Sequence, residues 1–184
     1  MIQLDDLPHF EEPNGIVWDL SACFDLTSSK VKLLHKYVNT RGNEARTNNE
    51  AATFNHISRS YSGKYVVEVM SETRCGVDME ALRPVELAWS IDSPFFEKAM
   101  LVPGEKELIL QSAFSEHQFL STLIWASKEA LAKALGDARN YEPSKLLSPI
   151  AWDALKTTTW CANYREFATG DDRRLAIWIV RENS

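Results

Sequence analysis

Two carboxylates near the middle of the chain are spaced as metal ligands would be. Residues 76–80 read Gly-Val-Asp-Met-Glu, an apolar strand that carries Asp78 and Glu80. Side chains at alternate positions of a strand point to the same face, so we expect these carboxylates to lie side by side. Taken alone, the pattern is more typical of a strand end with two solvated acids.

A third carboxylate follows on a predicted helix. Residues 125–136 are rich in Ala and Leu, and Glu129 and Lys133 lie one turn apart on one stripe of that helix. By itself such an i,i+4 pair is worth only about 0.3–0.5 kcal/mol and indicates no site. Together with the two strand carboxylates, however, Glu129 completes a set that suits a hard divalent cation holding a phosphate. We expect Trp125 to pack this helix on a sheet and Gly136 to end it.

Together the two segments resemble the signature of the 4′-phosphopantetheinyl transferase superfamily. That signature is a G-[VI]-D-x-E strand followed by a W-x-x-K-E-x-x-x-K-x-x-G helix. Residues 76–80 and 125–136 carry every named position, in this order and at a suitable spacing. Either segment alone would be a weak signal, whereas the pair is specific. The resemblance extends from about Phe54 to the C-terminus, and the chain length is similar to that of the monomeric, surfactin-synthetase-activating type.

The resemblance implies an activity and a role for each matching residue. The family transfers 4′-phosphopantetheine from coenzyme A to a serine of an apo carrier protein, with Mg²⁺, and releases adenosine 3′,5′-bisphosphate. The matching Mg²⁺ ligands are Asp78, Glu80 and Glu129, and Glu129 also matches the base for the serine hydroxyl. Lys133 matches the lysine that steadies or protonates the leaving phosphate. Lys128 matches a further phosphate contact, although it also fits a solvated helix lysine.

The segment expected to bind coenzyme A departs from the family pattern. The family has F-N-x-S-H-S before its next strand, and the Ser and His there contact coenzyme A phosphates. Residues 54–64 here read F-N-H-I-S-R-S-Y-S-G-K. Ser58 therefore matches the serine, and either Arg59 or Tyr61 replaces the histidine. Arg59 is able to bind a phosphate bidentately, or it is a plain loop arginine.

Other arginines are also candidates for nucleotide contacts. Arg83 precedes a proline, where the family often has a basic residue, and it either touches the nucleotide phosphate or is simply exposed. The N-terminal half is shorter than in the family and lacks the Arg-rich helix that helps to hold the 3′-phosphate and adenine. Arg46 and Arg41, in the polar loop 39–51, are the candidates to replace it.

Composition excludes several classes of protein. The chain has 184 residues, of which 45% are hydrophobic and 25% charged, and this suits one compact domain or two small halves that share a core. A net charge of −6 argues against a nucleic-acid partner. The 3 cysteines form no C-x-x-C pair, and no apolar run approaches a membrane span. Because residues 1–6 are acidic and no apolar run follows them, we expect no signal peptide. We expect a cytoplasmic monomer, with coenzyme A and a carrier protein as partners and no membrane contact.

The order of the predicted elements indicates an α+β fold. The resemblance implies two pseudo-symmetric halves, residues 1–74 and 75–184, each a small, mostly antiparallel sheet packed on helices, with the active site in the cleft between them. Residues 71–74 form a link of hairpin length. The sequence predicts strands at 16–20, 65–69, 75–79, 150–159 and 174–180, and helices at 30–38, 84–89, 93–100, 103–112 and 117–135.

Two other functions fit part of the pattern. A non-catalytic paralogue would bind a carrier protein or a coenzyme A-like nucleotide, and Arg59 and the short N-terminal half favour it. The complete set of three carboxylates favours a transferase, because a binding module needs no full metal site. An unrelated Mg²⁺-dependent phosphohydrolase would share the D-x-E chemistry, but the helix signature does not suggest one.

Overall fold

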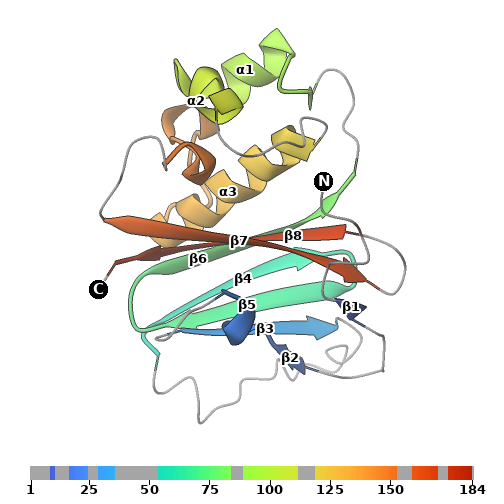
Figure 1. Ribbon diagram of the computed structural model, residues 1–184. Coiled ribbons are helices and arrows are strands. Elements are labelled where there is room, and N and C mark those ends of the chain that lie inside the picture. The colour runs from blue at the N-terminus through green and yellow to red at the C-terminus, as the bar shows by residue number, and fades with distance from the viewer. Residues whose placement is uncertain are drawn as a thin grey trace.

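The structure is a computed structural model, and its described parts form three layers: helices, a first sheet and a second sheet (Figure 1). Sheet A has the strand order β1-β7-β8-β6, and sheet B has the order β2-β3-β5-β4. Every pairing is antiparallel except that of β1 with β7. The predicted α+β fold with two small, mostly antiparallel sheets is therefore confirmed. The structure describes residues 9–10, 17–24, 29–35, 54–83, 89–111, 119–152, 159–169 and 174–183.

The strands of sheet B come from the N-terminal part of the chain, and those of sheet A, except β1, come from the C-terminal part. Sheet B contains β2 (Val17–Asp19), β3 (Ser29–His35), β4 (His56–Ser62) and β5 (Tyr65–Ser71). Sheet A contains β1 (His9–Phe10), β6 (Cys75–Leu82), β7 (Trp160–Thr169) and β8 (Arg174–Glu182).

The α-helices lie on the side of sheet A that faces away from sheet B (Figure 1). None of the helices in the described part of the chain is both long and apolar enough to cross a membrane. The α-helices are α1 (Pro94–Met100), α2 (Glu105–Gln111) and α3 (Leu120–Leu135), and short 3₁₀ turns occur at η2 (Ser21–Phe24), η7 (Pro143–Lys145) and η8 (Pro149–Ala151).

Three local predictions were wrong, each because tertiary context overrode a short-range pattern. The predicted helix at 30–38 is strand β3, which pairs with β5 along its whole length, from Ser29 opposite Ser71 to His35 opposite Tyr65. The link at 71–74 joins strands of different sheets and so forms no hairpin. The predicted strand at 150–159 begins instead as the 3₁₀ turn η8. The predicted helix at 84–89 lies mostly outside the described residues.

Alternate side chains of β6 face two different parts of the protein. Val77 and Met79 are fully buried between the two sheets, in a cluster with side chains of β5 and β8. Residues at the intervening positions of β6 point the other way, toward α3. A second hydrophobic cluster fills the space between sheet A and the helices. Asp78 and Glu80 therefore lie on the helix-facing side of β6.

Gly76 lets α3 approach β6 at backbone distance. A Cβ atom at this position would lie 1.9 Å from the carbonyl oxygen of Ala130 and 2.4 Å from the amide nitrogen of Ala134. Only a residue without a side chain permits this contact. The helix then ends at Gly136, which has a left-handed backbone (φ 79°). Its amide donates hydrogen bonds to carbonyl oxygens of the last turn and so forms a C-terminal cap.

We expect Gly76→Ala to force α3 away from β6 and to destabilise the fold. The clash involves backbone atoms, which cannot rotate aside, so the loss should reach or exceed about 3 kcal/mol, the upper end for overpacked cores. Urea unfolding measures the loss. Gly104→Ala is the comparison, because a Cβ there meets nothing within 4 Å and only its left-handed backbone (φ 81°) opposes the change. Equal losses in the two variants would contradict the close approach of α3.

Candidate functional site

Asp78 is the point at which both sheets and α3 meet. Its Oδ1 accepts a hydrogen bond from Ser60 Oγ at 2.7 Å and forms an ion pair with Lys133 Nζ at 2.6 Å. Lys133 also donates to the carbonyl oxygen of Val77 at 3.1 Å. Asp78 Oδ2 is buried and receives no hydrogen bond from the residues that the structure describes. A buried carboxylate oxygen without a donor is costly unless a cation supplies the missing charge.

Glu80 and Glu129 share the electrostatic environment of Asp78. Glu80 is half-buried, and burial is the main reason that its pKa rises from 4.5 to about 7. The negative charges of Asp78 and Glu129 raise this pKa further, whereas Lys133 and Arg83 oppose the rise. The three carboxylates from the two sequence motifs are therefore close enough for their charges to interact.

The carboxylates are nevertheless not arranged as a finished metal site. Among the described residues, no three His, Cys, Asp or Glu side chains form a group able to hold a metal ion as they stand. Lys133 neutralises one oxygen of Asp78, and Tyr141 binds one oxygen of Glu129. The oxygen chemistry and the unpaired Asp78 Oδ2 fit a hard divalent cation. Binding of such a cation would require the side chains to turn toward one another.

Tyr141 is a site residue that the sequence motifs did not reveal. Its hydroxyl group donates a hydrogen bond to Glu129 Oε1 at 2.9 Å. Burial, followed by the hydrogen bond to Glu129, raises the pKa of Tyr141 well above its usual value, so the phenol stays protonated as a donor. The residue lies after α3, outside both sequence motifs, and no spacing rule connects it with Glu129.

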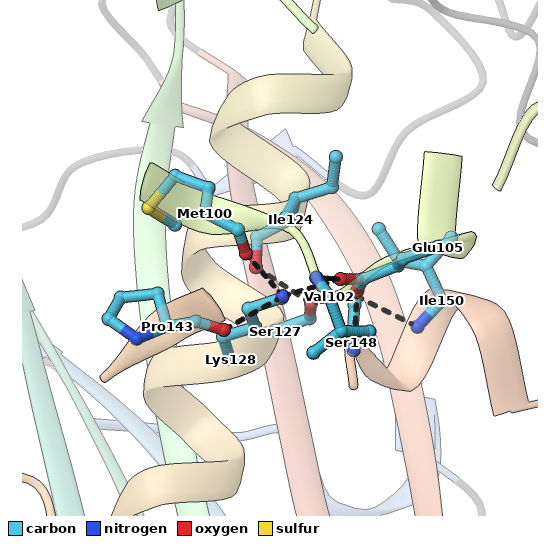
Figure 2. A network of polar contacts seen from close by, with 9 residues as sticks. All are labelled: Met100, Val102, Glu105, Ile124, Ser127, Lys128, Pro143, Ser148 and Ile150. Carbon is cyan, nitrogen blue, oxygen red and sulfur yellow. Dashed lines mark hydrogen bonds and ion pairs between the residues drawn. The ribbon is translucent and has the colours of Figure 1, made fainter. Parts of the chain in front are cut away.

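Lys128 points into a buried network of polar groups (Figure 2). Its side chain is completely buried and forms an ion pair with Glu105 at 2.7 Å. The ammonium also donates to the carbonyl oxygens of Met100 and Pro143. Burial lowers the pKa of Lys128, and the bond to Glu105 offsets part of this effect. All three N–H groups are thus used internally, so the expected phosphate contact is corrected to a structural role.

Glu105 completes this buried network. Its Oε2 accepts from the amide of Val102 at 2.8 Å, and its Oε1 accepts from the amide of Ser148 at 2.6 Å. Ser148 also shares a 2.7 Å hydrogen bond with Ser127 of α3. The network joins α3 to the start of α2 and to the loop at 143–148, as Figure 2 shows.

The segment expected to bind phosphate is strand β4, in which successive side chains point to opposite faces of sheet B. The candidate residues therefore lie on two different faces. Ser58 accepts a hydrogen bond from the Val77 amide at 3.0 Å, and Ser60 reaches Asp78, so both serines face β6. Arg59 and Tyr61 occupy the intervening positions and face the other way. Arg59 forms an ion pair there with the buried Glu68. Of the two roles left open for Arg59, this pairing therefore does not favour a phosphate contact beside the carboxylates.

Arg83 lies at the exposed end of β6, beside a pocket of about 340 Å³. The pocket adjoins Glu80 and has apolar walls formed in part by Trp89 and Trp125. Trp125 is 37% exposed, lines this pocket and is not part of the hydrophobic cluster between α3 and sheet A, so the expectation that it packs the helix on the sheet is wrong. The candidate Arg46, like Arg41, lies outside the described residues.

Comparison with known proteins agrees with this geometry. The model of the 4′-phosphopantetheinyl transferase superfamily matches residues 74–178, which is more than half of the 184-residue chain and includes both motifs. The chain belongs to this superfamily. The resemblance inferred from the two motifs is thus confirmed.

One curated relative of this superfamily is 4′-phosphopantetheinyl transferase psf-1 of Bacillus pumilus. It is 28% identical over 118 residues, which cover 64% of this chain and 47% of that protein. The chain therefore matches about half the length of this phosphopantetheinyl transferase.

Removing the charge of Glu80 should stabilise the metal-free protein at alkaline pH. Because the folded-state pKa is raised, the native protein binds more protons than the unfolded chain between pH 4.5 and about 7, and its stability falls as pH rises through that window. Glu80→Gln should therefore unfold at a higher temperature than wild type at pH 8 in EDTA, with little difference at pH 4. The exposed Glu72→Gln is the control, and an equal gain in that variant would argue against a strained Glu80.

Removing one partner of the buried Lys128–Glu105 ion pair should destabilise the fold strongly. Replacing both partners with uncharged residues should destabilise it less than the two single changes together. Glu105→Gln leaves the Lys128 ammonium buried without a counter-charge and should lose about 3–5 kcal/mol in urea unfolding. The double variant Glu105→Gln/Lys128→Met should lose less than the sum of its single changes. The exposed Glu142–Lys145 pair provides the control, since Glu142→Gln should cost under about 1 kcal/mol. Additive losses at Glu105 and Lys128 would contradict the coupling.

Proposed function

We propose that this protein transfers 4′-phosphopantetheine from coenzyme A to a serine of an apo carrier protein, in a Mg²⁺-dependent reaction. The observation that carries the proposal is the meeting of Asp78, Glu80, Glu129 and Lys133 at the contact between β6 and α3, in a member of this superfamily. These carboxylates come from two motifs that are far apart in the sequence, on a strand and on a helix. In the fold they lie close enough for their charges to interact.

The proposed Mg²⁺ ligands are Asp78, Glu80 and Glu129. Asp78 offers the buried Oδ2, and a cation there would relieve the repulsion from Asp78 and Glu129 that adds to the effect of burial on the pKa of Glu80. Oxygen donors of this kind suit Mg²⁺, which binds a few carboxylates together with phosphate oxygens and water. Bound Mg²⁺ would neutralise charge on the pyrophosphate oxygens of coenzyme A.

The protein side chains then have separate parts in the transfer. The serine oxygen of the carrier forms a bond to the β-phosphorus of coenzyme A, and the bond from that phosphorus to the bridging oxygen breaks. The bridging oxygen keeps the electron pair and leaves with adenosine 3′,5′-bisphosphate. Glu129 takes the proton of the serine hydroxyl, because a carboxylate in hydrogen-bond reach can act as a general base. Lys133 supplies positive charge near the leaving phosphate.

The substrate contacts are proposed from position. Arg83, which is exposed just after β6 and lines the pocket beside Glu80, would contact a nucleotide phosphate. Ser58 contributes a hydroxyl next to the strand that carries the carboxylates. The pocket beside Glu80 has apolar walls that fit the pantetheine arm leading away from the pyrophosphate. We propose that the protein is a monomer in the cytoplasm. A reducing compartment suits the three free cysteines among the described residues.

The alternative is a non-catalytic paralogue that binds a carrier protein or a coenzyme A-like nucleotide. The pairing of Arg59 with Glu68 favours this alternative, because it removes one expected phosphate ligand from the site. Mass spectrometry separates the two functions. Apo carrier proteins incubated with the chain, coenzyme A and Mg²⁺ should gain one phosphopantetheine on serine, and a carrier that stays unmodified while it binds the chain would support the paralogue.

Glu129→Gln should reduce the transfer rate by at least the 10²–10⁴-fold typical of acid–base groups. The substitution removes a charge but little volume, so the circular dichroism spectrum should not change. Glu107→Gln, on the exposed side of α2, is the matched control and should keep the wild-type rate. Near-normal turnover by Glu129→Gln would refute the role assigned to this residue.

A further inference from the structure

The chain reverses direction directly after α3. The carbonyl oxygen of Asp137 accepts hydrogen bonds from the amides of Asn140 and Tyr141, both at 3.1 Å. The Asp137 amide itself donates to Ala132 in the last turn of the helix, at 2.9 Å. This turn brings Tyr141 back alongside α3, where its hydroxyl meets Glu129.

The segment that follows is fixed to the interior of the protein. Lys128 donates to the carbonyl oxygen of Pro143 at 3.0 Å, two residues after Tyr141. Ser148, at the other end of the segment, is held by the carboxylate of Glu105 (Figure 2). Neighbouring residues of one helix thus have different tasks, since Lys128 anchors the loop and Glu129 receives the side chain that the loop carries.

The hydrogen bond from Tyr141 constrains one carboxylate oxygen of Glu129 and does not involve the other. It engages Glu129 Oε1, and no other hydrogen bond or ion pair to Glu129 is formed by the described residues. A carboxylate on a mobile side chain rotates freely, and a single fixed oxygen limits that rotation. Hydrogen-bonded partners of this kind orient metal-binding carboxylates and raise their effectiveness as ligands.

We propose that Tyr141 is a positioning residue for Glu129: its hydroxyl holds Oε1, limits the rotation of the carboxylate and leaves Oε2 available to a cation. This inference rests on the proposed function, in which Glu129 acts as cation ligand and base. Tyr141 does not itself touch the reacting atoms, and its effect passes through Glu129.

The test compares two tyrosine substitutions in the full chain. Tyr141→Phe removes only the hydroxyl group. Tyr164→Phe is the matched control, because Tyr164 also bonds a glutamate, Glu166, but lies on β7, separated from β6 by β8. Calorimetric titration with Mn²⁺ alone measures cation affinity without substrate, and steady-state assays with coenzyme A measure kcat and KM separately.

We expect Tyr141→Phe to weaken Mn²⁺ binding by about 10- to 100-fold and to lower kcat to a similar extent. The KM for coenzyme A should stay within about twofold of the wild-type value, because the hydroxyl contacts Glu129 and not the nucleotide. Tyr164→Phe should behave as wild type. In the background of Glu129→Gln, the change at Tyr141 should have no further effect on Mn²⁺ affinity.

Several results would overturn the inference. These are a wild-type Mn²⁺ affinity in Tyr141→Phe, an equal loss in Tyr164→Phe, or the same loss when Glu129 is already Gln. A wild-type protein that transfers nothing refutes the proposed function, but the Mn²⁺ titrations still decide the role of Tyr141. A wild-type protein that binds no Mn²⁺ refutes both.

Discussion

The backbone contact between β6 and α3 is the constraint on which the site depends. Gly76 has no side chain, so Ala130 and Ala134 of the helix lie directly on the strand. Glu129 and Lys133 come next to these alanines in sequence and are therefore carried to the edge of the same contact. The ion pair between Lys133 and Asp78 is a consequence of this approach. A wider spacing between strand and helix would separate the two motifs.

A second requirement is that α3 cannot rotate or slide on the sheet. The buried network around Lys128 and Glu105 meets this requirement, since it ties the helix to α2 and to the loop at 143–148. A buried ion pair gives little net stability, but it is strongly unfavourable to break. Such a pair therefore selects one orientation of the helix more than it stabilises the fold. It also explains why Lys128 and Glu129, neighbours in sequence, face opposite surroundings.

The two sheets are joined at the same place by side chains of β4. Ser58 accepts from the Val77 amide, and Ser60 donates to Asp78, so hydroxyl groups bridge edge strands that belong to different sheets. The sequence suggested that phosphate ligands follow one another in this segment. In a strand, however, neighbouring residues face opposite sides, and Arg59 consequently pairs with Glu68 away from the carboxylates. The similarity of this segment to the family pattern therefore could not decide which face of β4 Arg59 occupies.

The sequence alone determined the two motifs, the α+β class and the strands around residues 65–69, 75–79 and 174–180, because these depend on local periodicity and on residue types with specific chemistry. It also determined the face shared by Asp78 and Glu80, since alternation follows from strand geometry. Tertiary structure alone decided the strand at 29–35, the burial of Lys128 and the contact of Tyr141 with Glu129. Each of these results from groups that are distant in sequence, and their pairing energies override the weak preferences of short segments.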